Sequence, residues 1–105
     1  MTVYENNNQF DSSNVQFIHG KLIKYEKGSN NRQMRHIDYG VTFFRKEAFR
    51  PWANQSSFDL SEVCHKLATR GQLLGFEVFG RFYEIGSLQG IEEISQYLWG
   101  AKNEF

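Results

Sequence analysis

The first 45 residues carry short hydrophobic runs that are separated by polar turn segments. Residues 2–5 are rich in β-forming side chains, and asparagine- and serine-rich stretches follow them. Residues 15–26 predict a hairpin that turns around Gly20 and Lys21. The longest β-rich run covers residues 37–45 and predicts a buried strand. This half of the chain therefore favours a sheet that leans antiparallel.

From Lys46 onward the hydrophobic period becomes helical. A single helical turn is predicted at residues 47–50, because a proline at position 51 disfavours the helical conformation of the residue before it. A longer helix begins after Asp59, a typical N-cap residue, and ends at Gly71, a typical C-cap residue. The chain therefore places one well-marked helix after the predicted sheet.

The last third of the chain predicts two more short strands and a second main helix. The strands cover residues 76–79 and 81–85, on either side of Gly80. Ser87 is the predicted N-cap of the helix, and Gly100 is its predicted end. The fold class predicted from these elements is α+β, with a mixed, antiparallel-leaning sheet and two main helices.

Composition limits the classes of function. A chain of 105 residues fits one domain. Twelve basic and twelve acidic residues cancel, so there is no positive excess to neutralise the phosphates of a nucleic acid. No apolar run approaches the length that spans a bilayer, and the first residues lack the pattern of a signal peptide. With the lone Cys64 no internal disulfide can form, which favours a cytoplasmic location.

The residues that usually form metal or nucleophile sites give no local motif. His19, His36 and His65 lie far apart, and none has the spacing of a zinc motif. Cys64 falls in the apolar stripe of the first main helix, which indicates a small buried hydrophobic residue. The sequence therefore predicts no metal site built from these residues.

Seven short motifs follow one another in an order that is itself informative. They are MTVY at 1–4, SNV at 13–15, YEK at 25–27, HIDYG at 36–40, FDL at 58–60, GFEV at 75–78 and RFYEIG at 81–86. In this order they resemble the later half of bacterial sugar-phosphate nucleotidyltransferases, and most of all the branch similar to mannose- and heptose-1-phosphate guanylyltransferases. The resemblance covers nearly the whole chain and implies part of a Rossmann-like nucleotide-diphospho-sugar transferase fold.

The resemblance also implies an activity and a cofactor. Enzymes of this family transfer a nucleotidyl group from a nucleoside triphosphate to a sugar 1-phosphate, release pyrophosphate and use Mg²⁺. Their triphosphate lies on a glycine-rich loop, and an acidic residue in the same half binds the metal; neither feature is found in these 105 residues. We therefore expect a carboxy-terminal, sugar-side portion that lacks the amino-terminal nucleotide-binding half and is inactive alone.

The family match assigns a role to two adjacent residues at the end of the predicted hairpin. Lys27 is the expected catalytic residue and faces phosphate oxygens, while Glu26 faces sugar hydroxyls. An ammonium group suits this task because it offsets negative charge as that charge builds up on phosphate. The family usually has proline after the lysine, whereas Gly28 follows here. The alternative is a solvated strand end without a ligand.

Two further positions follow from the same resemblance. Asp38, Tyr39 and Gly40 are expected to line the sugar pocket, with the glycine allowing close backbone approach. The alternative there is a structural glycine at a bulge. Glu84 stands where the family often has an aspartate that completes the Mg²⁺ site, and magnesium favours such hard oxygen ligands. The alternative for Glu84 is the outward-facing residue of a strand.

A second hypothesis comes from a different class of protein. Ten phenylalanines and a sheet without all its neighbouring strands would leave an apolar face and an open edge. Two copies could cover both by forming a homodimer. The chain would then be a non-catalytic interaction module, or one subunit of a split transferase whose partner is the amino-terminal half.

Overall fold

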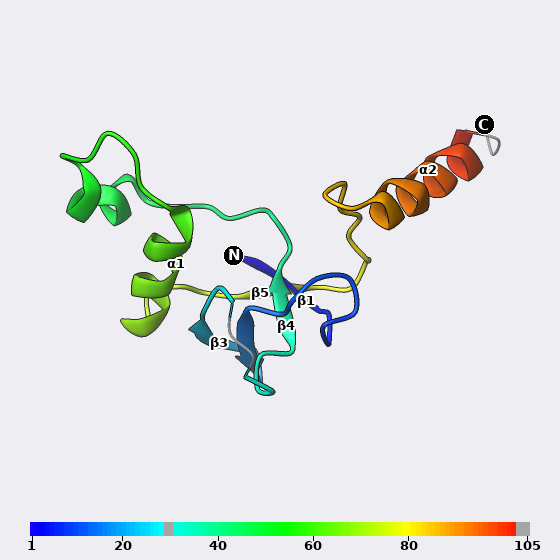
Figure 1. The fold of residues 1–105 in the computed structure, drawn as a ribbon. Coiled ribbons are helices and arrows are strands. Elements are labelled where there is room, and N and C mark those ends of the chain that lie inside the picture. Colours follow the sequence, from blue (N-terminus) through cyan, green and yellow to red (C-terminus); the bar gives the residue numbers. More distant parts are fainter. Residues whose placement is uncertain (29–30, 103–105) are drawn as a thin grey trace.

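Five short strands form one mixed sheet in the computed structural model, which describes residues 1–28 and 31–102 (Figure 1). The strands are β1 (Thr2–Glu5), β2 (Val15–Ile18), β3 (Lys21–Tyr25), β4 (His36–Asp38) and β5 (Phe76–Val78). Their order across the sheet is β3-β2-β4-β1-β5. All neighbours pair antiparallel except β1 and β5, which are parallel. The predicted mixed, antiparallel-leaning sheet is confirmed.

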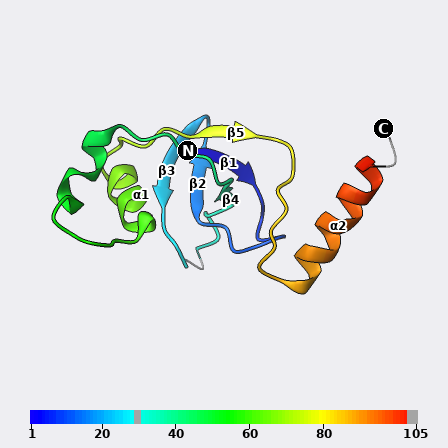
Figure 2. The same cartoon turned by 90° about the horizontal axis from the view of Figure 1, so that it is seen from above.

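Within the described residues three helices accompany the sheet. They are the 3₁₀-helix η1 (Lys46–Trp52) and the α-helices α1 (Leu60–Thr69) and α2 (Leu88–Lys102). Helix α1 packs beside β3, whereas α2 projects away from the sheet at the other end of the molecule (Figures 1 and 2). The α+β class is thus confirmed. None of the helices that the structure describes is long and apolar enough to cross a membrane.

The hydrophobic core lies between the sheet and α1. It consists of buried residues from β1, β2 and β3 together with residues of α1 and the segment after it: Val3, Val15, Leu22, Tyr25, Cys64, Ala68 and Leu73. Burying an aliphatic side chain of this kind stabilises a fold by about 1.5–3 kcal/mol. The predicted burial of Cys64 is confirmed, since only 3% of this residue is exposed.

The boundaries of α1 agree with the sequence prediction. The Asp59 carboxylate accepts a hydrogen bond from the Ser61 backbone N–H at 2.9 Å, as an N-cap does. At the other end Gly71 has φ +68°, and the Gln72 N–H donates to the Leu67 carbonyl at 2.8 Å. This 6→1 bond and the left-handed glycine together form a Schellman motif.

The β2–β3 hairpin turns one residue earlier than predicted. Ile18 pairs with Lys21, so the two loop residues are His19 and Gly20. Both have positive φ, at 51° and 79°, which is the conformation of a type I′ turn. This turn matches the twist of the flanking strands and therefore sets the register of the hairpin.

Of two further predicted strands, one is much shorter than predicted and the other is wrong. The run 37–45 is a strand only as far as Asp38, because the chain turns at Gly40. Gly40 has a φ of 109°, a backbone conformation that glycine adopts readily and other residues rarely adopt. Beyond the turn Phe43 is 91% exposed, so this part is not buried. Residues 81–85 form no strand either, since their side chains pack instead on residues near the start and end of the chain.

Two predicted helix ends also need correction. Helix η1 does not stop before Pro51 but continues to Trp52, and the Ala53 N–H closes it on the Arg50 carbonyl at 3.1 Å. Helix α2 does not end at Gly100 and continues to Lys102. Its predicted start is confirmed, because Ser87 Oγ accepts a hydrogen bond from the Gly90 N–H at 3.0 Å.

Candidate functional site

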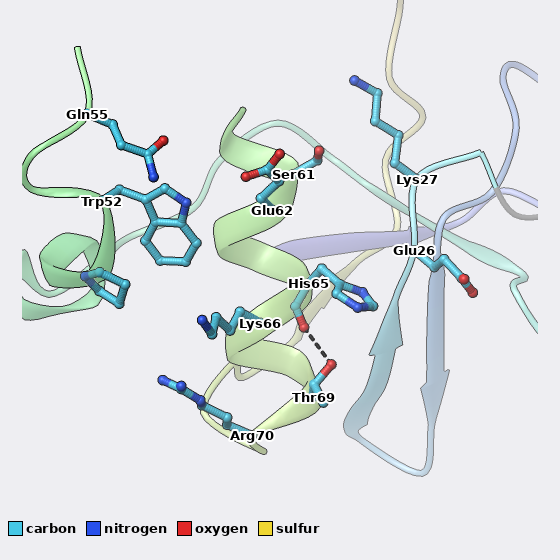
Figure 3. A pocket seen from close by; sticks show the side chains of 11 residues that line it. Glu26, Lys27, Trp52, Gln55, Ser61, Glu62, His65, Lys66, Thr69 and Arg70 are labelled. Atoms are coloured by element: carbon cyan, nitrogen blue, oxygen red, sulfur yellow. Dashed lines mark hydrogen bonds between the residues drawn. The ribbon is translucent and has the colours of Figure 1, made fainter. Parts of the chain in front are cut away.

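A wide groove of about 780 Å³ lies over the surface of α1. Residues from the end of β3, from η1 and the segment after it, and from α1 line the groove: Glu26, Lys27, Pro51, Trp52, Gln55, Ser61, Glu62, His65, Lys66, Thr69 and Arg70. Glu26 and Lys27 lie on one side of α1, and Trp52 and Gln55 lie on the other (Figure 3). Of the residues predicted from the sequence, Glu26 and Lys27 are the two that line this groove.

The backbone at the end of β3 fixes the position of Glu26 and Lys27. The Glu26 N–H donates to the Asn14 carbonyl at 2.9 Å, which ties this strand end to the segment before β2. The two adjacent side chains then point in different directions, as they do along an extended chain (Figure 3). After them the chain turns at Gly28, whose φ is 75°. Gly28 therefore serves a left-handed turn.

The Lys27 ammonium is largely exposed and has one weak partner. Its Nζ lies 3.6 Å from Asp59 Oδ2, and 69% of the Lys27 side chain is accessible. An exposed ion pair of this kind contributes about 0–1 kcal/mol. The pKa of Asp59 is lowered first by the hydrogen bonds from Ser61 and then by Lys27. The ammonium can therefore exchange this partner for an anionic ligand at little cost.

Three further nitrogen-bearing side chains follow α1 along the groove. His65 Nδ1 donates to the Tyr25 carbonyl at 2.8 Å, which orients the ring and leaves Nε2 as its second polar atom. Lys66 Nζ lies 5.5 Å from the centre of the Trp52 ring, a cation–π contact. Arg70 is one turn further along the same helix face. The groove thus combines an aromatic wall with several cationic groups.

Asp38, Tyr39 and Gly40 lie outside this groove. The Asp38 carboxylate accepts a hydrogen bond from the Gly40 N–H at 2.9 Å and so closes the turn at the end of β4. The Tyr39 hydroxyl donates to the Arg81 carbonyl at 3.5 Å, and its ring packs near Tyr4, with centroids 6.2 Å apart. The structure therefore does not place these three residues in the groove with Lys27. Asp38 and Gly40 form a turn, and Tyr39 packs on β1 and on the loop at Arg81.

Glu84 lies in the loop that leads into α2. Its Oε2 accepts a hydrogen bond from the Gly86 N–H at 2.7 Å, and its Oε1 accepts one from Ser87 Oγ at 2.6 Å. Both carboxylate oxygens thus hold the loop at the helix start. Within the described residues Glu84 joins no group of three candidate metal ligands. A Mg²⁺ ion at Glu84 would therefore take most of its oxygen ligands from water, from a substrate or from another protein.

Sequence reasoning did not single out Trp52, Lys66 and Arg70 as groove residues. Lys66 and Arg70 lie at the carboxyl end of α1, where cations interact favourably with the helix dipole. Their spacing of four residues is the signal that could have found them, because it places both on one helix face. Trp52 reaches the groove through the packing of η1 against α1, which no local pattern predicts.

Comparisons of the chain with protein-family models, curated proteins and solved structures found no match.

Proposed function

We propose that this chain forms the sugar-phosphate side of a nucleotidyltransferase with a partial, Rossmann-like nucleotide-diphospho-sugar transferase fold. The observation that carries the proposal is the position of Lys27, an exposed ammonium at the rim of a groove that also holds His65, Lys66 and Arg70. Such a groove suits a ligand with a sugar body and a phosphate group. The order of the seven sequence motifs supports the same family.

In the proposed reaction an oxygen of the sugar 1-phosphate attacks the α-phosphorus of a nucleoside triphosphate. A new bond forms between this oxygen and the α-phosphorus. The bond between the α-phosphorus and the oxygen that bridges it to the β-phosphorus breaks, and pyrophosphate leaves. Lys27 orients the sugar phosphate and offsets its negative charge, and Glu26 accepts hydrogen bonds from sugar hydroxyls. The protein side chains form no covalent bond to the substrates.

In this proposal a second protein segment binds the nucleoside triphosphate. These 105 residues contain no glycine-rich loop that opens a helix, and such loops supply the backbone N–H groups that cradle phosphates. The partner would be an amino-terminal half, and it would bring the ligands that complete a Mg²⁺ site with Glu84. Asp38, Tyr39 and Gly40 stay proposed sugar contacts. The lone Cys64 is consistent with a cytoplasmic setting.

The test is the binding of mannose 1-phosphate to the isolated chain, measured by calorimetry and by amide chemical shifts. We expect weak binding that Lys27→Ala reduces by about tenfold or more, because a charge-assisted contact is lost. Lys21→Ala is the matched control, since Lys21 lies at the start of β3, is exposed and does not line the groove. Free mannose should bind more weakly than its phosphate.

Two results would contradict the proposal. The absence of binding by any sugar 1-phosphate at millimolar concentration would remove the substrate assignment. An equal loss of affinity in Lys27→Ala and Lys21→Ala would show that the sugar phosphate does not bind at Lys27. A separate assay of pyrophosphate release tests the expected inactivity, and robust turnover by the 105 residues alone would show that no second protein is needed.

A second candidate function, a homodimeric interaction module, is favoured by the exposed apolar side chains of α2. Leu88 is 87% exposed and Leu98 is 57% exposed, and at the sheet edge Phe76 of β5 is 69% exposed. Sedimentation over a range of concentrations tests this candidate. A dimer that Leu98→Glu dissociates would support it, and a monomer at the highest concentration would rule it out.

A further inference from the structure

Three side chains that could bind a metal ion lie close together on the sheet, away from the groove. Glu5 of β1, His36 of β4 and Glu77 of β5 each offer one ligand atom, and these atoms all lie within 4.8 Å of one another. The three strands are adjacent in the sheet. Glu5 pairs directly with His36, and Glu77 lies opposite Val3, two residues before Glu5 on the same face. Strand pairing therefore holds the group together.

The imidazole of His36 is nearly enclosed and only half satisfied. His36 is 7% exposed, and its Nε2 lies 2.6 Å from Glu77 Oε2. The Phe17 ring packs on it edge to face, with centroids 5.1 Å apart. The buried Nδ1 has no hydrogen-bond partner within the described residues. Nε2 is the ring nitrogen that faces Glu77 and is therefore the ligand atom that this imidazole offers to a metal ion, with the proton on Nδ1.

The Glu5 carboxylate is available for a ligand. It is exposed and takes part in no hydrogen bond or ion pair of the described residues. Arg32 and Arg35 line the adjoining cavity of about 570 Å³ together with Glu5 and His36, yet neither pairs with Glu5. This cavity gives solvent a path to the group. Two carboxylates beside one imidazole repel each other unless a cation lies between them.

We propose that Glu5, His36 and Glu77 bind a divalent transition-metal ion of the Zn²⁺ type. One imidazole nitrogen and two carboxylate oxygens form a donor set that zinc accepts, with water in the remaining position. The nitrogen donor disfavours Mg²⁺, which prefers oxygen ligands and keeps its waters. The histidine spacing predicted no such site, because its ligands come from three strands that are distant in sequence. The proposal does not depend on the nucleotidyltransferase assignment.

The experiment is a calorimetric titration of the metal-free 105-residue chain with ZnCl₂, with CoCl₂ absorption as a second readout of nitrogen and oxygen ligation. We expect one bound ion per chain, a higher melting temperature in the presence of Zn²⁺, and no competition from Mg²⁺. Glu5→Gln should weaken Zn²⁺ binding by about tenfold or more. This variant removes no hydrogen bond or ion pair of the described fold, so its fold should be intact.

Two control variants separate this site from other ligands. Glu47→Gln removes an exposed carboxylate of η1 and should leave Zn²⁺ binding unchanged. His65→Gln tests a competing site beside Cys64 and should also leave it unchanged. The absence of Zn²⁺ binding to the unaltered chain would overturn the proposal. It would also be overturned if Glu5→Gln and Glu77→Gln bound Zn²⁺ as tightly as the unaltered chain, or if His65→Gln alone abolished binding.

Discussion

The sheet with α1 and the helix α2 differ in what their apolar side chains contact. In the first region, which we call the body, Val3, Val15 and Val63 are fully buried. In α2 Leu88 is 87% exposed and Leu98 is 57% exposed. Both α1 and α2 begin with a capped first turn and carry an apolar stripe. Capping and periodicity thus determine where a helix forms, while burial needs a second surface.

Helix α2 is held by local contacts with the loop before it. Arg81 forms an ion pair with Glu93 at 2.9 Å, and the Tyr83 and Tyr97 rings stack with centroids 5.0 Å apart. A helix of this length is marginal in water unless packing supports it. We therefore expect α2 to open at a lower free energy than the body, and the four predictions that follow test this difference.

The largest contrast should appear in cysteine labelling. Burial raises the pKa of the Cys64 thiol to about 11, so at pH 8 the thiol is protonated as well as enclosed. A cysteine placed at Leu98, in a Cys64→Ala background, would be exposed. We expect its reaction with a disulfide reagent to be faster by about a thousandfold or more, because Cys64 must wait for the body to open. In strong denaturant the two rates should become similar. Comparable rates in native buffer would mean that the body opens as easily as α2.

The next contrast concerns two leucine truncations. Leu22→Ala, at a position that is 8% exposed, should lower the free energy of unfolding by about 2–5 kcal/mol. Leu98→Ala, at a position that is 57% exposed, should change it by less than about 0.5 kcal/mol. Urea unfolding measures both. A large loss in Leu98→Ala would indicate that α2 is covered in solution, for instance by a second copy.

The two helix caps give a smaller difference. Asp59→Ala should reduce the free energy of unfolding of the body by about 1 kcal/mol, since α1 belongs to the core. Ser87→Ala should leave that transition unchanged and should instead speed amide hydrogen exchange in the first turn of α2. Amide hydrogen exchange measured by NMR distinguishes the effects of the two variants. If Ser87→Ala also lowered the stability of the body, the two regions would unfold as one unit.

The smallest effect is a pH dependence of α1. The pKa of Asp59 is lowered, mainly by hydrogen bonds from Ser61. Its stabilising contribution is therefore complete above its ordinary value of 3.8 and is lost as the pH falls through the lowered value. Asp59→Asn keeps the cap without the charge. The stability difference between the two proteins should shrink between about pH 5 and about pH 2. If the stability difference between the unaltered protein and Asp59→Asn stayed constant over this range, the pH dependence would come from another carboxylate.

The fold could be predicted where local signals decide the structure. Asp59 and Gly71 bound α1, and the positive-φ residues His19 and Gly20 close the hairpin, within one residue of prediction. The run 41–45 was mistaken for a strand because its β-forming side chains have no strand to pair with beyond Gly40. β-propensity alone therefore cannot place a strand, since strand formation depends on a neighbour that is distant in sequence.

The candidate sites show the same limit. Glu26 and Lys27 were predicted from the resemblance of their sequence motif, but the opposite wall of the groove depends on how η1 packs on α1. The group of Glu5, His36 and Glu77 depends on the register of three strands. No spacing along the chain encodes that register.

The pairing of β1 with both β4 and β5 has a consequence for the order of folding. β1 is near the first residue, yet its parallel neighbour β5 begins only at Phe76. The β2–β3 hairpin and α1 can form from nearby residues, whereas the β1–β5 pair requires the closure of a long loop. On a ribosome β1 would therefore emerge before β5 and stay unpaired on that side until residues 76–78 had been synthesised. A chaperone that protects an unpaired strand edge would therefore find its target at β1.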